Sequence, residues 1–151
     1  MTSVVNLYAK WLREGRLKVD PSRNGEAVVT LHDPCNVVRK ATLDGFPGIG
    51  DDARFVLSRV VENFVEMDPN RENNICCSGG GGALINGFAR ARTYYGKVKV
   101  EQIKRSGAKR VCTPCVNCFD GIGNLAREYK ETWEFEPVHM WTLLANALIL
   151  D

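Results

Sequence analysis

The stretch that most constrains this chain runs from residue 75 to residue 84 and reads Ile-Cys-Cys-Ser-Gly-Gly-Gly-Gly-Ala-Leu. The adjacent Cys76 and Cys77 are poor partners for each other, because a disulfide between neighbours in the chain is strained. Four consecutive glycines can adopt left-handed backbone conformations and bring their amides close to a large group. Successive N–H groups that turn the same way form a cradle for an anion. The stretch therefore predicts a binding site for a negatively charged metal–sulfur group.

The other cysteines support a metal or redox site. Cys35 ends the segment Leu-His-Asp-Pro-Cys, and Cys112, Cys115 and Cys118 lie in Cys-Thr-Pro-Cys-Val-Asn-Cys. A C-x-x-C spacing alone is shared by zinc sites, iron–sulfur sites and redox dithiols. Thiolates suit both zinc and iron–sulfur clusters, and spacing alone leaves these two equal. A mononuclear zinc site needs only four ligands, so five clustered cysteines favour a multi-iron group.

The pattern of these cysteines resembles the CCG cysteine-rich domain family, which occurs in two of the subunits of heterodisulfide reductase and in related iron–sulfur proteins. The resemblance extends from about Leu7 to the C-terminus. The matching segments are His32-Asp33-Pro34-Cys35 with Arg39, Cys76-Cys77-Ser78-Gly79-Gly80-Gly81, and Cys115-Val116-Asn117-Cys118.

The resemblance implies a non-cubane [4Fe–4S] cluster and a reductive function. Electrons would pass from the cluster to a disulfide or thiol acceptor, or onward within a respiratory complex beside a membrane quinone-interacting subunit. The residues that the resemblance assigns as cluster ligands are Cys35, Cys76, Cys77, Cys115 and Cys118.

Three positions depart from the family pattern. Ser78 replaces the glycine that gives the motif its name, and Val116 stands where relatives often have proline. Cys112 is an additional thiol, which is either a further ligand or redox partner or a buried core residue, since free cysteine packs like a small hydrophobe.

Other residues near the cysteines are candidates for the site. We expect Gly79, Gly80, Gly81 and Gly82 to donate backbone hydrogen bonds to cluster sulfurs; the alternative is a flexible loop without contact. His32 and Arg39 are the catalytic candidates. His32 could donate a proton to a substrate sulfur or hydrogen-bond a thiolate, and Arg39 could offset negative charge or bind an anionic substrate. For both, a structural or solvated role is the alternative. His139, beside Met140 and Trp141, is expected to be structural.

Two other function classes remain open from the residues alone. One is a zinc-stabilised docking module without catalysis of its own. The other is a cluster-free thiol–disulfide switch in which C-x-x-C cycles between dithiol and disulfide.

Length and composition place limits on the chain. Its 151 residues predict one domain, residues 1–151, with 44% hydrophobic and 25% charged residues as in ordinary globular proteins. A net charge of +2 gives no argument for nucleic acid binding. The chain carries no ferredoxin motif, which implies a ferredoxin-like electron donor on another domain or subunit and suggests a C-terminal domain excised from a larger protein. The sequence has no signal peptide or long apolar run, so a cytoplasmic location, or one peripheral to a membrane complex, is expected.

Hydrophobic periodicity predicts an α/β fold with a parallel sheet of about four strands and helices on its faces. We expect the cysteine groups to converge at the carboxyl-terminal edge of the strands, where ligands bind in such sheets. The predicted strands are residues 27–31, 63–67, 110–113 and 132–135. The predicted helices are residues 4–15, 52–63, 83–95, 97–106, 118–129 and 140–150, while residues 36–52 read as loop.

Overall fold

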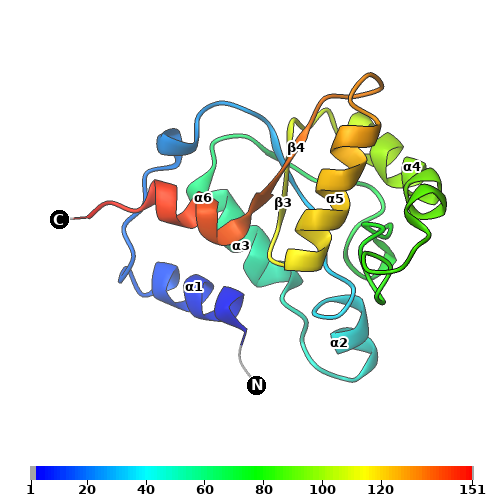
Figure 1. Cartoon of the computed structure of the whole chain (residues 1–151). Helices are drawn as coiled ribbons and strands as arrows, with labels where there is room; N and C mark the ends of the chain where they lie inside the picture. The colour runs from blue at the N-terminus through cyan, green and yellow to red at the C-terminus, as the bar shows by residue number, and fades with distance from the viewer. Residues whose placement is uncertain (1–2, 151) are drawn as a thin grey trace.

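A four-stranded parallel sheet forms the centre of the protein, as predicted (Figure 1). The structure, a computed structural model, describes residues 3–150. The strand order is β2-β1-β3-β4. The strands are β1 (Val29–Leu31), β2 (Phe64–Val65), β3 (Arg110–Thr113) and β4 (Glu136–His139).

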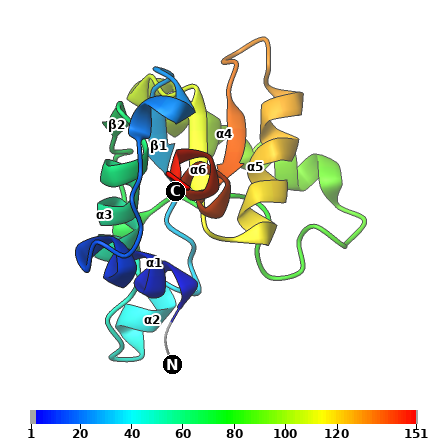
Figure 2. The same cartoon turned by 90° about the vertical axis from the view of Figure 1, so that its left-hand side faces the viewer.

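The helices cover both faces of the sheet (Figure 2). Helices α1, α3 and α6 lie on one face, and α4 and α5 pack together on the other. The bounds are α1 (Val4–Arg13), α2 (Arg39–Leu43), α3 (Gly50–Val60), α4 (Ala89–Ser106), α5 (Val116–Glu128) and α6 (Met140–Ala147), with 3-10 turns η1 (Pro21–Asn24) and η2 (Arg71–Asn73).

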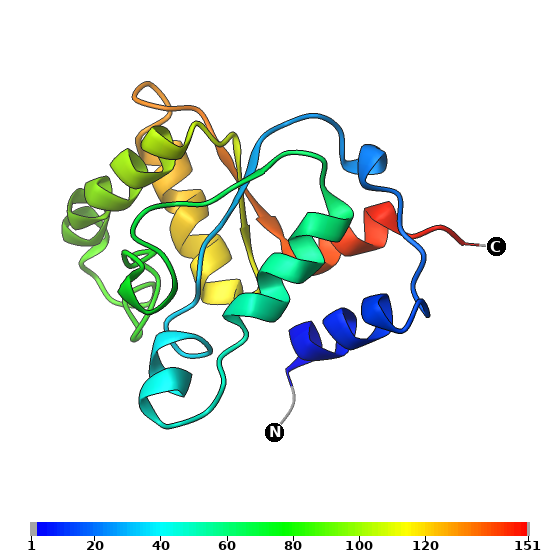
Figure 3. The same cartoon turned by 180° about the vertical axis from the view of Figure 1, so that it is seen from behind.

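Each face of the sheet buries its own apolar cluster. Successive side chains of a strand point to opposite faces. Cys112 accordingly belongs to the same apolar cluster as Val56 and Leu57 of α3, whereas its neighbour Val111 belongs to the cluster of Ile122 of α5. The view from behind shows α3 lying across the first of these faces (Figure 3).

The chain changes direction between the two central strands. It moves from β1 outward to β2, returns through α4 to β3, and continues through α5 to β4 at the other edge. The connections that follow β1 and β3 therefore leave toward opposite faces. The carboxyl ends of two such strands are the usual ligand site of a parallel sheet.

Two predicted helices and a predicted loop differ from the structure. The helix expected at residues 83–95 begins only at Ala89, because the glycine-rich segment before it forms turns, with Gly81 and Gly82 at positive φ. It also continues through Gly96 to Ser106, so the two predicted helices are one. The segment 36–52, expected as loop, contains α2 and the start of α3.

The fourth strand was expected at residues 132–135 but lies at Glu136–His139. Pro137 argued against predicting a strand at this position, because proline has no N–H to donate to a neighbouring strand. Within residues 3–150, strand β4 is at the edge of the sheet and pairs only with β3, so a residue without an N–H is tolerated there.

A buried ion pair connects the end of β1 to α3. Arg54 donates to both carboxylate oxygens of Asp33 at 2.9 Å and to Glu66 at 2.6 and 3.0 Å. The side chain of Asp33 is only 1% exposed, and besides Arg54 it accepts from the Arg71 amide at 2.7 Å.

We expect Arg54→Met to lower the free energy of unfolding by about 3 kcal/mol, because it leaves a buried carboxylate without its partner. Chemical denaturation measures the change. Arg13→Met is the matched control, since Arg13 forms an exposed pair with Asp52 of the same helix α3 and should cost less than about 1 kcal/mol. Equal effects of the two substitutions would contradict the prediction.

Candidate metal centre

The segments that follow β1 and β3 begin side by side. The two strands pair in parallel with Leu31 opposite Cys112, and the next amide, that of His32, donates to the Cys112 carbonyl at 2.8 Å. The His32 side chain is fully buried as a result. Cys35, three residues further on, is half-buried.

Three potential ligands from distant parts of the chain meet at this edge. A ring nitrogen of His32 and the sulfurs of Cys77 and Cys118 all lie within 4.8 Å of one another, and all three residues are buried. Cys76, the neighbour of Cys77 in the chain, is exposed. The structure therefore brings Cys77 and Cys118 together, and the assignment of these cysteines as ligands stays a prediction.

Three of the five predicted ligands, Cys35, Cys76 and Cys115, lie outside the group of His32, Cys77 and Cys118. Cys115 is half-buried and packs against the same apolar cluster as Cys77 and Cys118. Cys35 follows β1 on the same edge of the sheet but is not within ligand distance of the group. Their assignment as ligands stays a prediction.

The helix that begins at the centre is α5 and not the helix after the glycine run. Cys115 is its N-cap residue and Cys118 lies in its first turn.

The glycine-rich segment turns its first amides toward sulfur. The Ser78 amide donates to Cys76 Sγ at 3.3 Å, and the Gly79 amide donates to Cys77 Sγ at 3.4 Å. These bonds form part of the expected cradle. Gly81 and Gly82 adopt positive φ in open space, where a turn requires glycine.

Tight packing explains three other glycines. A Cβ on Gly79 would come within 2.2 Å of the Asn117 carbonyl oxygen, and one on Gly121 would come within 2.6 Å of the Cys77 carbonyl oxygen. A Cβ on Gly96 would meet Leu125 at 2.3 Å and the Ser78 hydroxyl at 2.7 Å. The sequence analysis did not assign a role to Gly96 or Gly121, since isolated helical glycines carry no local signal of close packing.

A buried lysine beneath the centre was also missed. Lys99 of α4 is 0% exposed, and its Nζ donates to Asn74 Oδ1 at 3.0 Å and to Gln102 Oε1 at 2.7 Å. Burial lowers the Lys99 pKa to about 7, although Cys77 and Asp33 oppose this shift. The helical spacing of Lys99 with Gly96, Val100 and Ile103 was the available signal that it faces the core.

Asn74 connects this lysine to His32. Its amide Nδ2 lies 3.0 Å from His32 Nδ1 and donates to the Asp33 carbonyl at 2.7 Å. The other ring nitrogen, Nε2, is buried and has no protein partner within residues 3–150. Burial, with a smaller contribution from Lys99, places the His32 pKa well below its ordinary value of 6.5, so the ring is neutral.

Arg39 contacts backbone and not an open site. Its guanidinium donates to the carbonyl oxygens of Glu72 and Asn74, which ties α2 to the segment before the cysteine pair. These contacts support a structural role. The anion-binding role stays a prediction.

Cys112 lies across the sheet from the centre. Its side chain belongs to the apolar cluster on the face of α3, whereas Cys77 and Cys118 belong to the cluster on the face of α5. Its placement supports the core-packing alternative. His139 stacks between Phe119 and Trp141, with ring centroids 4.2 and 4.3 Å apart, in keeping with a packing role.

The fold and this centre define a cysteine-rich α/β domain with clustered thiols at the carboxyl edge of a parallel sheet. The family model described as CCG, cysteine-rich domain, matches residues 29–122. The chain belongs to this family.

Similar proteins carry iron–sulfur and heterodisulfide reductase names. The chain is 32% identical over 118 residues to the Hdr-like menaquinol oxidoreductase iron–sulfur subunit of Archaeoglobus profundus, covering 74% of this chain and 20% of the relative. It is 36% identical over 135 residues to one subunit of the dihydromethanophenazine:CoB–CoM heterodisulfide reductase of Methanosarcina acetivorans, covering 89% and 31%. The chain thus spans less than a third of the length of these relatives.

We expect Ser78→Gly to stabilise the protein by up to about 1 kcal/mol. Ser78 has φ +64°, a left-handed conformation that costs a residue with a Cβ about 1–2 kcal/mol. Glycine avoids this cost, but it loses more conformational entropy on folding, which offsets part of the gain. Thermal or denaturant unfolding of the metal-free protein measures the effect. Ser58→Gly within α3 is the control and should destabilise by about 1 kcal/mol; a loss of stability in Ser78→Gly would contradict the prediction.

We expect the buried thiols of the metal-free protein to alkylate slowly at pH 8. Hydrogen bonding to Cys118 and burial raise the Cys77 pKa from 9.0 to about 12, so its reactive thiolate is scarce at pH 8 and increases up to about pH 12. Burial also raises the Cys112 pKa. Peptide mass spectrometry after iodoacetamide pulses measures each rate, with denatured protein as the reference; equal folded and denatured rates at Cys77 would refute the expectation.

Proposed function

We propose that this chain is an iron–sulfur redox domain that holds a non-cubane [4Fe–4S] cluster. The proposed ligands are Cys35, Cys76, Cys77, Cys115 and Cys118, and the cluster would pass electrons to a disulfide or thiol acceptor or onward within a respiratory complex. The observation that carries the proposal is the convergence of Cys77 and Cys118 with His32 at the carboxyl ends of β1 and β3. Membership of the CCG family and the names of the relatives support the iron–sulfur assignment.

The donors of the centre fit an iron–sulfur group. Thiolates are its usual ligands, and backbone amides already point at the sulfurs of Cys76 and Cys77. Such amide hydrogen bonds stabilise negative charge on sulfur and tune the reduction potential. We propose that Gly80, Gly81 and Gly82 extend this cradle.

When bound, the cluster would supply electrons one at a time. Reduction of a disulfide takes two electrons and two protons and yields two thiols. The protein's part is to hold the acceptor's sulfur beside the exposed Cys76 and to keep a proton on the buried His32 close to the sulfurs. Arg39 would act indirectly, by fixing the segment that carries Asn74.

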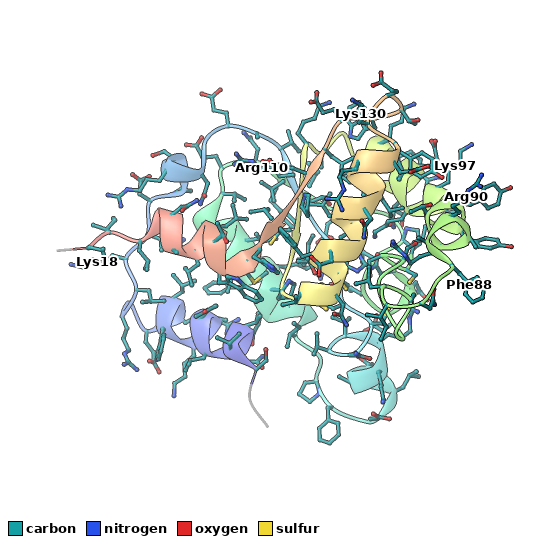
Figure 4. All side chains as sticks on the ribbon, in the orientation of Figure 1. Lys18, Phe88, Arg90, Lys97, Arg110 and Lys130 are labelled. Atoms are coloured by element: carbon teal, nitrogen blue, oxygen red, sulfur yellow. The ribbon has the colours of Figure 1, made fainter. Side chains whose placement is uncertain are left out.

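Electrons would come from a reduced ferredoxin-like iron–sulfur domain or subunit. The segment after the cysteine pair and the start of α4 expose several large apolar and aromatic side chains: Ile85, Phe88, Tyr94, Tyr95 and Val98. Figure 4 shows Phe88, Arg90 and Lys97 directed outward at this end of the molecule. We propose this end as the docking surface for the electron donor. If residues 1–151 are one domain of a larger protein, the donor is another domain of the same chain.

The relatives' names also suggest a membrane quinone-interacting subunit as a partner. None of the helices within residues 3–150 is long and apolar enough to cross a membrane. We propose a cytoplasmic position, peripheral to such a membrane complex.

A zinc-stabilised docking module is the second candidate. The observation that favours it is the three-membered group of His32, Cys77 and Cys118, to which Cys76 could add a fourth ligand. A cluster-free thiol–disulfide switch, in which the C-x-x-C cysteines Cys115 and Cys118 cycle between dithiol and disulfide, is the third candidate.

Metal analysis of anaerobically purified protein distinguishes these functions. We expect several irons with matching acid-labile sulfide per chain and visible absorption, because five thiols exceed the needs of one zinc. Cys77→Ala should lose the iron, whereas Cys112→Ala, the matched control on the other face, should keep it. One zinc per chain without sulfide would refute the proposal and leave the docking module; no metal with a mildly oxidisable thiol pair would leave the switch.

A further inference from the structure

The Asn74 side chain can bond in only one orientation. The atom 2.7 Å from the Asp33 carbonyl oxygen must be the amide nitrogen Nδ2, because a carbonyl oxygen only accepts. The oxygen Oδ1 then faces Lys99 Nζ at 3.0 Å, and Nζ donates to it. Both neighbours therefore require the same orientation of the amide.

This orientation fixes where His32 carries its proton. Asn74 Nδ2 is a donor and lies 3.0 Å from His32 Nδ1, so Nδ1 accepts with its lone pair and has no hydrogen. A neutral imidazole has one N–H, which must be at Nε2. Nε2 is buried and has no hydrogen-bond partner within the described residues. One nitrogen of the His32 ring lies within 4.8 Å of Cys77 Sγ and Cys118 Sγ.

We infer that Asn74, oriented by the Asp33 carbonyl and by Lys99, holds His32 as the Nε2–H tautomer, so that His32 presents a donor to a sulfur group bound at the centre and is not a metal ligand. A histidine that binds a metal presents a bare nitrogen to it and donates its other N–H to an acceptor. Here the other nitrogen faces a donor, which is the opposite arrangement. The inference deepens the proposed function. The tautomer of His32 does not depend on that function; only the identity of the sulfur group that accepts the hydrogen bond does.

Lys99 is itself held in place. Gln102 accepts from Nζ through Oε1 at 2.7 Å, and its Nε2 donates to the Pro69 carbonyl, which fixes the Gln102 amide in turn. Asn74 and Lys99 are thus positioning residues that act through His32, and the network extends from α4 to the end of β1.

Nitrogen NMR of the reduced, metal-free full chain tests the tautomer directly. The chain has two histidines, so a His139→Gln variant assigns both rings. We expect His32 to be neutral with a protonated Nε2 and a bare Nδ1. A proton at Nδ1, or at both nitrogens, near neutral pH would overturn the inference without any variant of the network.

Variants of the network test the positioning residues. Asn74→Asp replaces the donor with an acceptor of the same shape, so the His32 proton should move to Nδ1; a ring that keeps Nε2–H would overturn the role of Asn74. Lys99→Met removes one of the two constraints and should add a second population with Nδ1 protonated, while Lys97→Met, an exposed lysine of the same helix, should not. An unchanged ring in Lys99→Met would overturn the role of Lys99.

The cluster-loaded protein tests what His32 does at the centre. We expect His32→Leu to keep its iron and sulfide but to have a lower reduction potential, because an N–H that donates to sulfur favours the reduced cluster. His139→Leu is the matched control and should leave the potential unchanged. Loss of iron in His32→Leu but not in His139→Leu would make His32 a ligand and overturn the inference. Wild-type protein that never takes up iron would refute the proposed function, and the NMR experiment would still test the tautomer.

Discussion

The parallel pairing of β1 with β3 is the contact on which the site depends. It places Leu31 beside Cys112, so the segment with His32 and Cys35 and the segment with Cys115 and Cys118 begin at neighbouring points. Because the chain leaves these strands toward opposite faces, their carboxyl ends form the switch point at which parallel sheets usually bind ligands. The cysteine pair reaches this point from the long connection between β2 and α4.

Close backbone packing then fixes the cysteine pair against two helices. Gly79 and Gly121 leave no room for a Cβ against backbone atoms, so the segment of the pair lies directly on α5, and a Cβ on Gly96 of α4 would meet the side chains of Leu125 and Ser78. In an isolated loop these glycines would confer mobility. Here their lack of a side chain is a steric requirement, and it brings the Cys77 and Cys118 sulfurs close to each other.

The polar groups around the thiols form a connected network in a buried site. Such networks are costly unless each member is satisfied. Lys99, Gln102 and Asn74 satisfy one another and the backbone of neighbouring segments, which leaves His32 Nε2 as the unpartnered group of this network within the described residues. An unsatisfied buried N–H is stabilised when a sulfur acceptor with negative charge is present, so the network favours a thiolate-bound group.

Sequence alone determined the class of fold and the presence of a cysteine-rich site, because strand and helix periodicity and cysteine spacing are local patterns. It misjudged the helix after the glycine run and the edge strand at Pro137, where local signals compete with packing and with the strand's place at the edge of the sheet. Only the tertiary structure showed that Lys99 is buried, that Gly96 and Gly121 are steric requirements and that Cys112 lies on the opposite face from the centre. Each of these depends on neighbours far away in the chain, and side-chain burial and hydrogen-bond partners are set by those neighbours and not by adjacent residues.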